Sequence, residues 1–512
     1  MMACVVPLAS AAEEQNYLIK NCEIIIPSDF ISSLTVSDVE GRGTINILAG
    51  TSYNGVLYSF TYRGTKCHDE WAPVSTFNTN GDIEEIVVKD ADNDGKYDII
   101  INGAKSKKQK LPDKYVFVLS MTNNNLLSRF GYDKDCGASN SVDTADLYGY
   151  TEESILFGTE SKKVCAIVNW SKSKKQLLWS SDVLDNPVQY IEAADYDGDG
   201  ETEIMAFTKA RYEASIYLLD KDGKVLWKHA IPGGVRTDES INVWVEDLNN
   251  DGKLEILVGT QDHGLDVIGH NGDLLWNFPT TDGSKNTIVS KVQAYGYFMD
   301  GDYPVVVVGA KPYIYVLDHN GDLIWRAYVN TTVFDFDYGD LDGDGGNELV
   351  VGATSYIYVY GADGQLKGLW SYVAEIQGMT GLYSKRDMDT VKVAVYDFDN
   401  DGKYEILAAF KWFDDQLDLN VPQGSMRMFE LNPDYRPPSE VTSTAATTLP
   451  GTSVTTVTHA TTAVTQETTA STLPDLGGGG GGLCSCLPLL PAVLALAAAV
   501  ALGLPLAVHK AR

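Results

Sequence analysis

A nine-residue acidic pattern recurs five times along this 512-residue chain, and an apolar run follows each copy. In the copy at 195–203, carboxylates stand at positions 1, 3, 5 and 9 and glycine stands at position 6. Because carboxylates held this close repel one another, the pattern favours a bound cation. Oxygen ligands arranged around a glycine turn suit Ca²⁺. The sequence therefore predicts a series of structural calcium loops.

The five copies together predict about five calcium sites and their ligands. A single copy would be a weak signal, since Asp and Gly are also ordinary turn residues. Five copies in register, each with an acid at position 9, favour the metal interpretation. The predicted ligands are Asp90, Asp92, Asp94 and Asp98; Asp195, Asp197, Asp199 and Glu203; Asp247, Asn249, Asp251 and Glu255; Asp340, Asp342, Asp344 and Glu348; and Asp397, Asp399, Asp401 and Glu405.

Three degenerate copies, which lack key carboxylates, begin near Asp38, Asp146 and Gly296. The eight starting points are spaced by 44 to 57 residues, the size of one four-stranded blade of a β-propeller. Each unit reads as four strands, A to D, with the acidic loop between A and B and an Asp-Gly or Asn-Gly hairpin turn between C and D. Tryptophans follow several of these hairpin turns and are expected to pack between blades: Trp276, Trp325 and Trp370.

The two ends of the repeat region complete each other. The last unit contains strands A to C but no strand D, whereas an orphan strand is expected at 17–26. We expect this N-terminal strand to supply the missing strand D and close the ring, which removes exposed sheet edges. The predicted fold class is all-β, an eight-bladed propeller, with seven blades as the alternative if one degenerate unit is not a full blade.

The loops resemble a known family of repeats. The pattern D-x-[DN]-x-D-G-x-x-[DE] running into Glu-Ile-Leu-Val-Gly, as at 247–259, is similar to the FG-GAP/VCBS repeats of integrin-α-like propellers. The resemblance covers about residues 15–435 and implies a calcium-stabilised, often adhesive propeller at a cell surface. The degenerate copies depart from the pattern. Segments such as 317–325 also look like repeats of pyrroloquinoline-quinone propellers, although no distinct cofactor motif accompanies them.

The chain ends predict export and anchoring. Residues 1–12 read as a signal segment and 13–435 as the propeller. Residues 436–482 form a Ser/Thr/Gly-rich stalk, 483–508 a transmembrane helix and 509–512 a cytoplasmic tail. Alternatives are a sorting signal replaced by a lipid anchor and a GPI signal. All place the propeller on the cell surface, with a prokaryotic (archaeal) envelope as one candidate setting.

Charge and cysteines narrow the partners and the chemistry. The formal net charge of −31 argues against nucleic acid, since phosphate binding needs clustered cations. Four cysteines lie in the propeller region: Cys22, Cys67, Cys136 and Cys165. Outside a cell these residues can form disulfides, and Cys136–Cys165 is the preferred pairing because both residues are expected near the same face. Four isolated buried thiols are the alternative.

Long connections mark the face where a ligand is expected. B–C connections, expected at 103–113 and 411–423 among others, and D–A connections emerge on one face, opposite the acidic loops. Function concentrates on such loops. Their candidate ligand residues are Arg236, Tyr383, Arg386, Trp412, Phe413, Asp414 and Asp415. The predicted function is binding or adhesion to an extracellular glycan or protein. The alternatives are a lyase-like polysaccharide-active enzyme, for which the seven histidines form no constellation, and a structural envelope component.

Overall fold

The computed structural model describes residues 18–432, apart from short internal gaps at 28, 38–44, 53, 62–72, 80, 104–114, 121–125, 131–135, 172–174, 211–212, 233–241, 282–286, 297, 300, 330, 372–388 and 415–420. The predicted signal segment, stalk and transmembrane helix lie outside these residues. Within the described part, no helix is long and apolar enough to cross a membrane.

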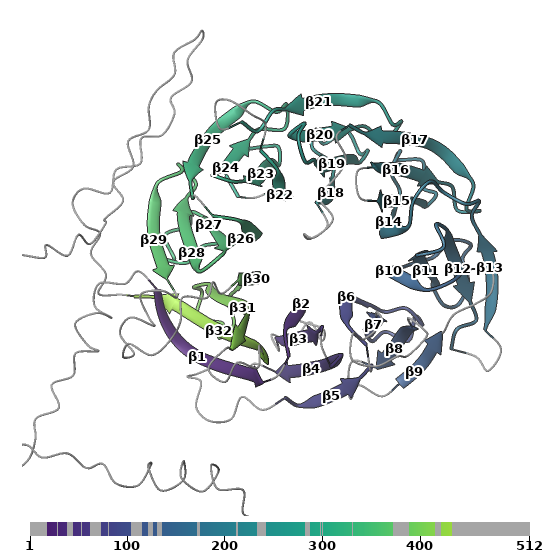
Figure 1. The fold of residues 1–512 in the computed structure, drawn as a ribbon, viewed down its shortest axis with the longest axis horizontal. Coiled ribbons are helices and arrows are strands. Elements are labelled where there is room, and N and C mark those ends of the chain that lie inside the picture. Colours follow the sequence, from purple (N-terminus) through teal and green to yellow (C-terminus); the bar gives the residue numbers. More distant parts are fainter. Residues whose placement is uncertain are drawn as a thin grey trace, which may run out of the picture. The chain divides into compact units, whose positions relative to one another are not determined.

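Eight four-stranded antiparallel sheets form a ring of blades, as the sequence predicts (Figure 1). In each blade the first strand, A, lies nearest the centre and the fourth, D, lies on the outside. Blade 1 contains β2 (Ile31–Ser37), β3 (Asn46–Thr51), β4 (Val56–Thr61) and β5 (Ser75–Asn78); blade 2 contains β6 (Ile83–Lys89), β7 (Asp98–Gly103), β8 (Tyr115–Ser120) and β9 (Leu126–Phe130). Blade 3 contains β10 (Ser139–Ala145), β11 (Ser154–Thr159), β12 (Val164–Val168) and β13 (Gln176–Ser180); blade 4 contains β14 (Val188–Ala194), β15 (Glu203–Ala210), β16 (Glu213–Leu219) and β17 (Val225–Ile231).

The second half of the ring follows the same order of strands. Blade 5 contains β18 (Val243–Glu246), β19 (Glu255–Gly259), β20 (Leu265–Ile268) and β21 (Leu274–Phe278); blade 6 contains β22 (Val289–Tyr295), β23 (Val305–Ala310), β24 (Tyr313–Leu317) and β25 (Leu323–Tyr328). Blade 7 contains β26 (Val333–Gly339), β27 (Glu348–Ala353), β28 (Tyr356–Gly361) and β29 (Leu366–Ser371). Blade 8 contains β30 (Asp389–Tyr396), β31 (Glu405–Asp414), β32 (Val421–Leu431) and, from the other end of the chain, β1 (Leu18–Pro27).

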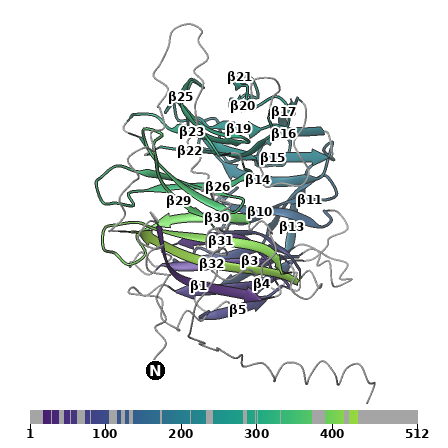
Figure 2. The same cartoon turned by 60° about the vertical axis from the view of Figure 1, so that its left-hand side comes forward.

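The N-terminal strand closes the ring, which confirms the prediction and the count of eight blades. β1 pairs antiparallel with β32, from Leu18 opposite Leu431 to Pro27 opposite Gln423. Figure 2 shows the two strands side by side. The Arg427 guanidinium, which lies over the rings of Trp370 and Phe410, also reaches Glu23 Oε1 through Nε at 2.8 Å and Nη2 at 2.7 Å.

The core lies between neighbouring blades, because the second strand of each blade is covered on both faces. β7, β19, β23 and β27 are buried along their whole length. The glycine that ends the Glu-Ile-Leu-Val-Gly run permits this close approach. A Cβ atom on Gly259 would lie 2.5 Å from Cγ1 of Val289 in the next blade, so a larger residue would push the blades apart.

Tryptophans on the outer strands join each blade to the next. The indole of Trp227 in blade 4 packs on Gly272 in the C–D turn of blade 5, and its Nε1–H donates to the His270 carbonyl at 2.7 Å. Trp276 and Trp325 pack in the same way on Gly321 and Gly364. Together with the contacts of Trp370 on blade 8, this confirms the inter-blade role expected for these side chains.

Two further expectations can be compared with the structure. Cys136 and Cys165 form a disulfide, as preferred from the sequence, and Cys22 is also disulfide-bonded. Residues 411–423 were expected to form a B–C loop, but β31 continues to Asp414 and β32 begins at Val421. The residues at the two ends of the expected loop, 411–414 and 421–423, therefore belong to the β-hairpin formed by β31 and β32.

Candidate metal loops and inner-strand polar ring

All five acidic loops connect strand A to strand B of their blade and share one scheme of hydrogen bonds. In the copy at 195–203, Asp195 accepts the backbone N–H of Asp199 at 3.1 Å and that of Gly200 at 2.8 Å. The Glu203 carboxylate accepts the N–H of Tyr196 at 2.9 Å. The side chains therefore fold the loop around its first residue, and a positive φ of 87° at Gly200 makes the sharp turn.

The other four loops repeat this arrangement at matching positions. The first residue accepts the N–H groups of positions 5 and 6 in each of them: Asp90, Asp247, Asp340 and Asp397, at 2.8–3.1 Å. The acid at position 9 accepts the N–H of position 2 in three of them: Glu255, Glu348 and Glu405, at 2.8–3.0 Å.

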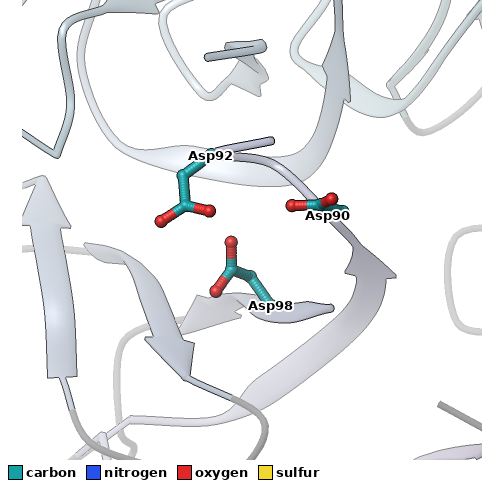
Figure 3. A group of neighbouring side chains, drawn as sticks. All are labelled: Asp90, Asp92 and Asp98. Carbon is teal, nitrogen blue, oxygen red and sulfur yellow. The ribbon is translucent and has the colours of Figure 1, made fainter. Parts of the chain in front are cut away.

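The structure brings carboxylates together within four of the loops. In each group the candidate ligand atoms lie within 4.8 Å of one another. Figure 3 shows the carboxyl groups of one such group converging from the two ends of its loop. The groups are Asp90, Asp92 and Asp98; Asp195, Asp197 and Asp199; Asp340, Asp342 and Asp344; and Asp397, Asp399 and Glu405. Asp94, Glu203, Glu348, Asp401 and the loop at 247–255, which has Asn249 at position 3, lie outside these groups.

The electrostatics of the loops fit a cation. Burial, reinforced by the neighbouring carboxylates, raises the pKa of Asp98 to about 7 and that of Glu405 to about 8. Asp98 is 4% exposed, and its Oδ2 is buried without a hydrogen-bond partner. A buried carboxylate oxygen without a partner is costly, and an all-oxygen donor set of this kind suits Ca²⁺. The residues present therefore fit a calcium ion.

The loop at 340–348 differs because the chain supplies a cation of its own. The Lys367 ammonium from β29 lies 3.1 Å from Asp342 Oδ2 and 2.5 Å from Glu348 Oε1. These contacts raise the pKa of Lys367 even though burial opposes them. Part of the negative charge of this loop is therefore neutralised within the protein.

A second polar feature, the inner-strand polar ring, lines the strands nearest the centre of the propeller. In strand A, the residues that lie 1, 3 and 5 positions before the first residue of the following loop are often polar. Most of the residues between them are apolar. Sequence reasoning missed this set, although the period-2 alternation was a readable signal. Its members include Glu85, Lys89, Ser141, Asp143, Tyr190, Glu192, Lys291, Gln293, Asp335, Asp337 and Lys392.

Several of these side chains join neighbouring blades. Strand A is the edge strand nearest the centre of the ring. Its N–H groups that point away from strand B therefore have no partner within the sheet. Glu85 of blade 2 accepts the N–H of Val142 in blade 3 at 2.9 Å, and Asp143 accepts that of Ala193 in blade 4 at 2.9 Å. The same contacts recur from Gln293 to Phe336, from Asp335 to Val393 and from Asp337 to Val395, at 2.6–3.2 Å.

One buried carboxylate connects three blades. Asp335 of blade 7 lies 3.0 Å from the Lys291 ammonium of blade 6 and 3.5 Å from the Lys392 ammonium of blade 8. Burial lowers the pKa of Lys291 despite its contact with Asp335. Burial opposes ionisation of Asp335 as well, but the two ammonium groups bring its pKa below the usual value.

The predicted ligand-face residues are only partly described. Arg236, Tyr383, Arg386 and Asp415 lie outside the described residues. Trp412, Phe413 and Asp414 lie in β31, where they pair with Gln423, Pro422 and Val421 of β32.

Comparisons with known proteins agree with this architecture. Residues 208–335 match the family described as the lambda-carrageenase beta-propeller domain, and residues 340–408 match the FG-GAP-like repeat. A lambda-carrageenase of Pseudoalteromonas carrageenovora is 28% identical over 78 residues, which are 15% of this chain and 8% of that protein. The chain thus spans less than a tenth of the length of this curated relative.

Two solved structures match most of the chain at low sequence identity. The Dos1 propeller matches with a TM-score of 0.50 and 10% identity, over 81% of this chain and 95% of that chain. Rhamnogalacturonan lyase YesW matches with a TM-score of 0.47 and 17% identity, over 82% and 76%. The repeats, the eight closed blades and the two family matches lead to one conclusion: this chain is an eight-bladed β-propeller that contains an FG-GAP-like repeat at 340–408.

Proposed function

We propose that this chain is a calcium-stabilised propeller that binds an extracellular glycan at a cell surface. The observation that carries the calcium part is the partnerless, buried Oδ2 of Asp98 beside Asp90 and Asp92. Calcium held there, and in the sister loops, would offset the repulsion among carboxylates next to the A–B connection. Its role is structural, because the loops lie on the face away from the long B–C and D–A connections.

The glycan part is supported by the match of residues 208–335 to a propeller domain of a protein named lambda-carrageenase. A protein ligand is the alternative, and the binding test must distinguish it from a glycan. The proposed placement at the cell surface is supported by the apolar segment at 483–508 and the signal-like segment at 1–12. Antibody labelling of intact cells tests this placement, and labelling that requires permeabilised cells would contradict it.

Calcium is tested by melting the full chain in Ca²⁺ and in a chelator. Each site filled at 100 times its Kd adds about 2.7 kcal/mol, so a chelator should lower Tm by several degrees. Asp98→Asn should bind one calcium ion fewer in titration calorimetry. Asp185→Asn, in the D–A connection between blades 3 and 4 on the face opposite the acidic loops, is the matched control and should keep the full number. Superimposable melting curves with and without chelator would refute the calcium role.

The ligand is tested on arrays of polysaccharides and extracellular proteins, with λ-carrageenan among the probes, in the presence and absence of Ca²⁺. Binding of a polysaccharide without its breakdown supports the proposal. Binding to proteins alone, or to nothing on the array, contradicts the glycan assignment. Depolymerisation would favour the second candidate, a polysaccharide-active enzyme, which the same family match supports.

A further inference from the structure

One position in strand C ties blades 4, 6 and 7 to the connections that precede them. This clamp position lies six residues before the glycine of the C–D turn and holds a tyrosine in blades 4, 6 and 7. Tyr315 donates to the Thr281 carbonyl at 3.3 Å and Tyr358 to that of Val329 at 3.1 Å, and Tyr217 accepts the N–H of Asp185 at 3.2 Å. In these blades the clamp position is therefore structural.

Blade 5 departs from this rule, because its clamp position holds Asp266. This carboxylate is fully buried, yet its two oxygens lie 2.8 Å and 3.1 Å from Nδ1 of His263 in the B–C turn of the same blade. Asn277 of β21 donates to Asp266 Oδ1 at 2.8 Å. A buried anion is costly unless it is paired. The aspartate at this position therefore needs an explanation other than the contact that tyrosine makes in blades 4, 6 and 7.

The turn that carries His263 is held rigidly. The Asn277 amide also donates to the carbonyls of His263 at 2.9 Å and Leu265 at 3.1 Å. The His263 N–H donates to Thr260 Oγ1 at 3.0 Å, and the Thr260 carbonyl accepts the N–H of Val289 at 3.1 Å. The imidazole is therefore positioned by β20, β21 and the start of blade 6, not by a mobile side-chain rotamer.

The free nitrogen of this imidazole faces outward. The His263 side chain is 39% exposed, and within the described part of the chain its Nε2 makes no hydrogen bond. In the tautomer whose Nδ1–H is donated to the Asp266 carboxylate, Nε2 is a hydrogen-bond acceptor. No group of three metal-ligating side chains among the described residues includes His263. A hydroxyl-bearing ligand is the chemistry that this acceptor fits.

We propose that His263 is a glycan-contacting residue on the B–C face of blade 5 and that the fully buried Asp266 is its positioning residue. The inference rests on the proposed glycan function and specifies where on the propeller the sugar is recognised. The contact is a hydrogen bond from a sugar hydroxyl to Nε2. Asp266 acts only through the ring, because it is buried beneath it.

The test measures binding of λ-carrageenan oligosaccharides to the full chain by titration calorimetry, using any other array polysaccharide that binds as a second probe. His263→Ala should weaken binding about tenfold, the effect of losing one hydrogen bond. His263→Gln retains an acceptor and should lose less. His319→Ala, in the C–D turn of blade 6, is the matched control because it removes a histidine from the opposite face, and its affinity should not change.

The role of Asp266 is read from a double-mutant cycle. Asp266→Asn should weaken binding in the wild-type background but cause no further loss in the His263→Ala background. A purely structural effect of Asp266 would appear in both backgrounds. As an independent readout, bound oligosaccharide should protect His263 from acylation by diethyl pyrocarbonate while His319 stays reactive.

The outcomes separate this inference from the proposed function. Wild-type affinity in His263→Ala, or acylation of His263 in the presence of saturating oligosaccharide, overturns the inference and leaves the glycan function standing. A wild-type chain that binds no polysaccharide on the array overturns both. Loss of affinity in His263→Ala with an unchanged Tm supports the inference.

Discussion

Replacing Asp335 by Asn removes the charge that connects blades 6, 7 and 8. The Lys291 ammonium then lies buried without a counter-charge, since its side chain is only 9% exposed, whereas the more exposed Lys392 can turn to solvent. Asn keeps the size of the side chain and an oxygen that can still accept the N–H of Val393. The perturbation therefore isolates the lost charge.

The magnitude follows from how Lys291 can respond. It can lose its proton, which at pH 7 costs about 4.6 kcal/mol for a lysine whose unperturbed pKa is about 10.4. This value limits the destabilisation and agrees with the roughly 3–5 kcal/mol measured when one partner of a buried pair is removed. For a propeller of roughly 400 residues the unfolding entropy is near 0.84 kcal/mol/K, so Tm should fall by about 5 °C.

Calorimetric melting at several pH values is the assay. A neutral buried lysine means that the native state binds fewer protons than the unfolded state, so stability rises with pH. The deficit of Asp335→Asn should therefore shrink by about 1.4 kcal/mol per pH unit between pH 7 and 9.

The exposed ion pair of Lys228 with Asp185 provides the control, and Asp185→Asn should cost less than about 1 kcal/mol with no such trend. A cost for Asp335→Asn as small as this control, or one that does not change with pH, would refute the reasoning.

Three further changes test other parts of the ring. Gly272→Ala should cost about 1–3 kcal/mol, because a Cβ would lie 2.8 Å from the Trp227 ring at a positive φ of 83°, whereas Gly296→Ala, with nothing within 4 Å, should be nearly neutral; equal melting temperatures would contradict the stacking argument. Burial raises the pKa of Glu85 from 4.5 to about 8, so the native state holds a proton that the unfolded state has lost, and stability should fall as pH rises through this window. Glu85→Gln should flatten that slope by up to about 1.4 kcal/mol per pH unit, and an unchanged pH profile in urea unfolding would show that Glu85 does not titrate there. Replacing Cys136 and Cys165 by Ala should cost about 3–4 kcal/mol from the loop they close, measured by urea unfolding, and a variant as stable as the parent would show that the bond adds nothing.

The sequence by itself determined the fold and the candidate metal ligands. Each repeat buries its strands only against neighbouring repeats, so regular loop spacing implies a ring, and the missing final strand implies closure by 17–26. The acidic loops are local, because their ligands lie within nine residues and fold around a glycine. Local patterns of this kind can be read without knowing how the blades meet.

Only the tertiary structure decided which side chains meet, both within a blade and between blades. Asp335 finds Lys291 and Lys392 from two other blades, and Lys367 reaches the loop at 340–348 from an outer strand of its own blade. The alternation of polar residues on strand A can be seen in the sequence. The groups that these residues contact in the next blade depend on how neighbouring sheets are staggered. The pairing of Asp266 with His263 was also not predicted. Asp266 can be compared with the tyrosines of other blades only once the register of strand C is known. Such contacts follow from the geometry between elements, which no local pattern encodes.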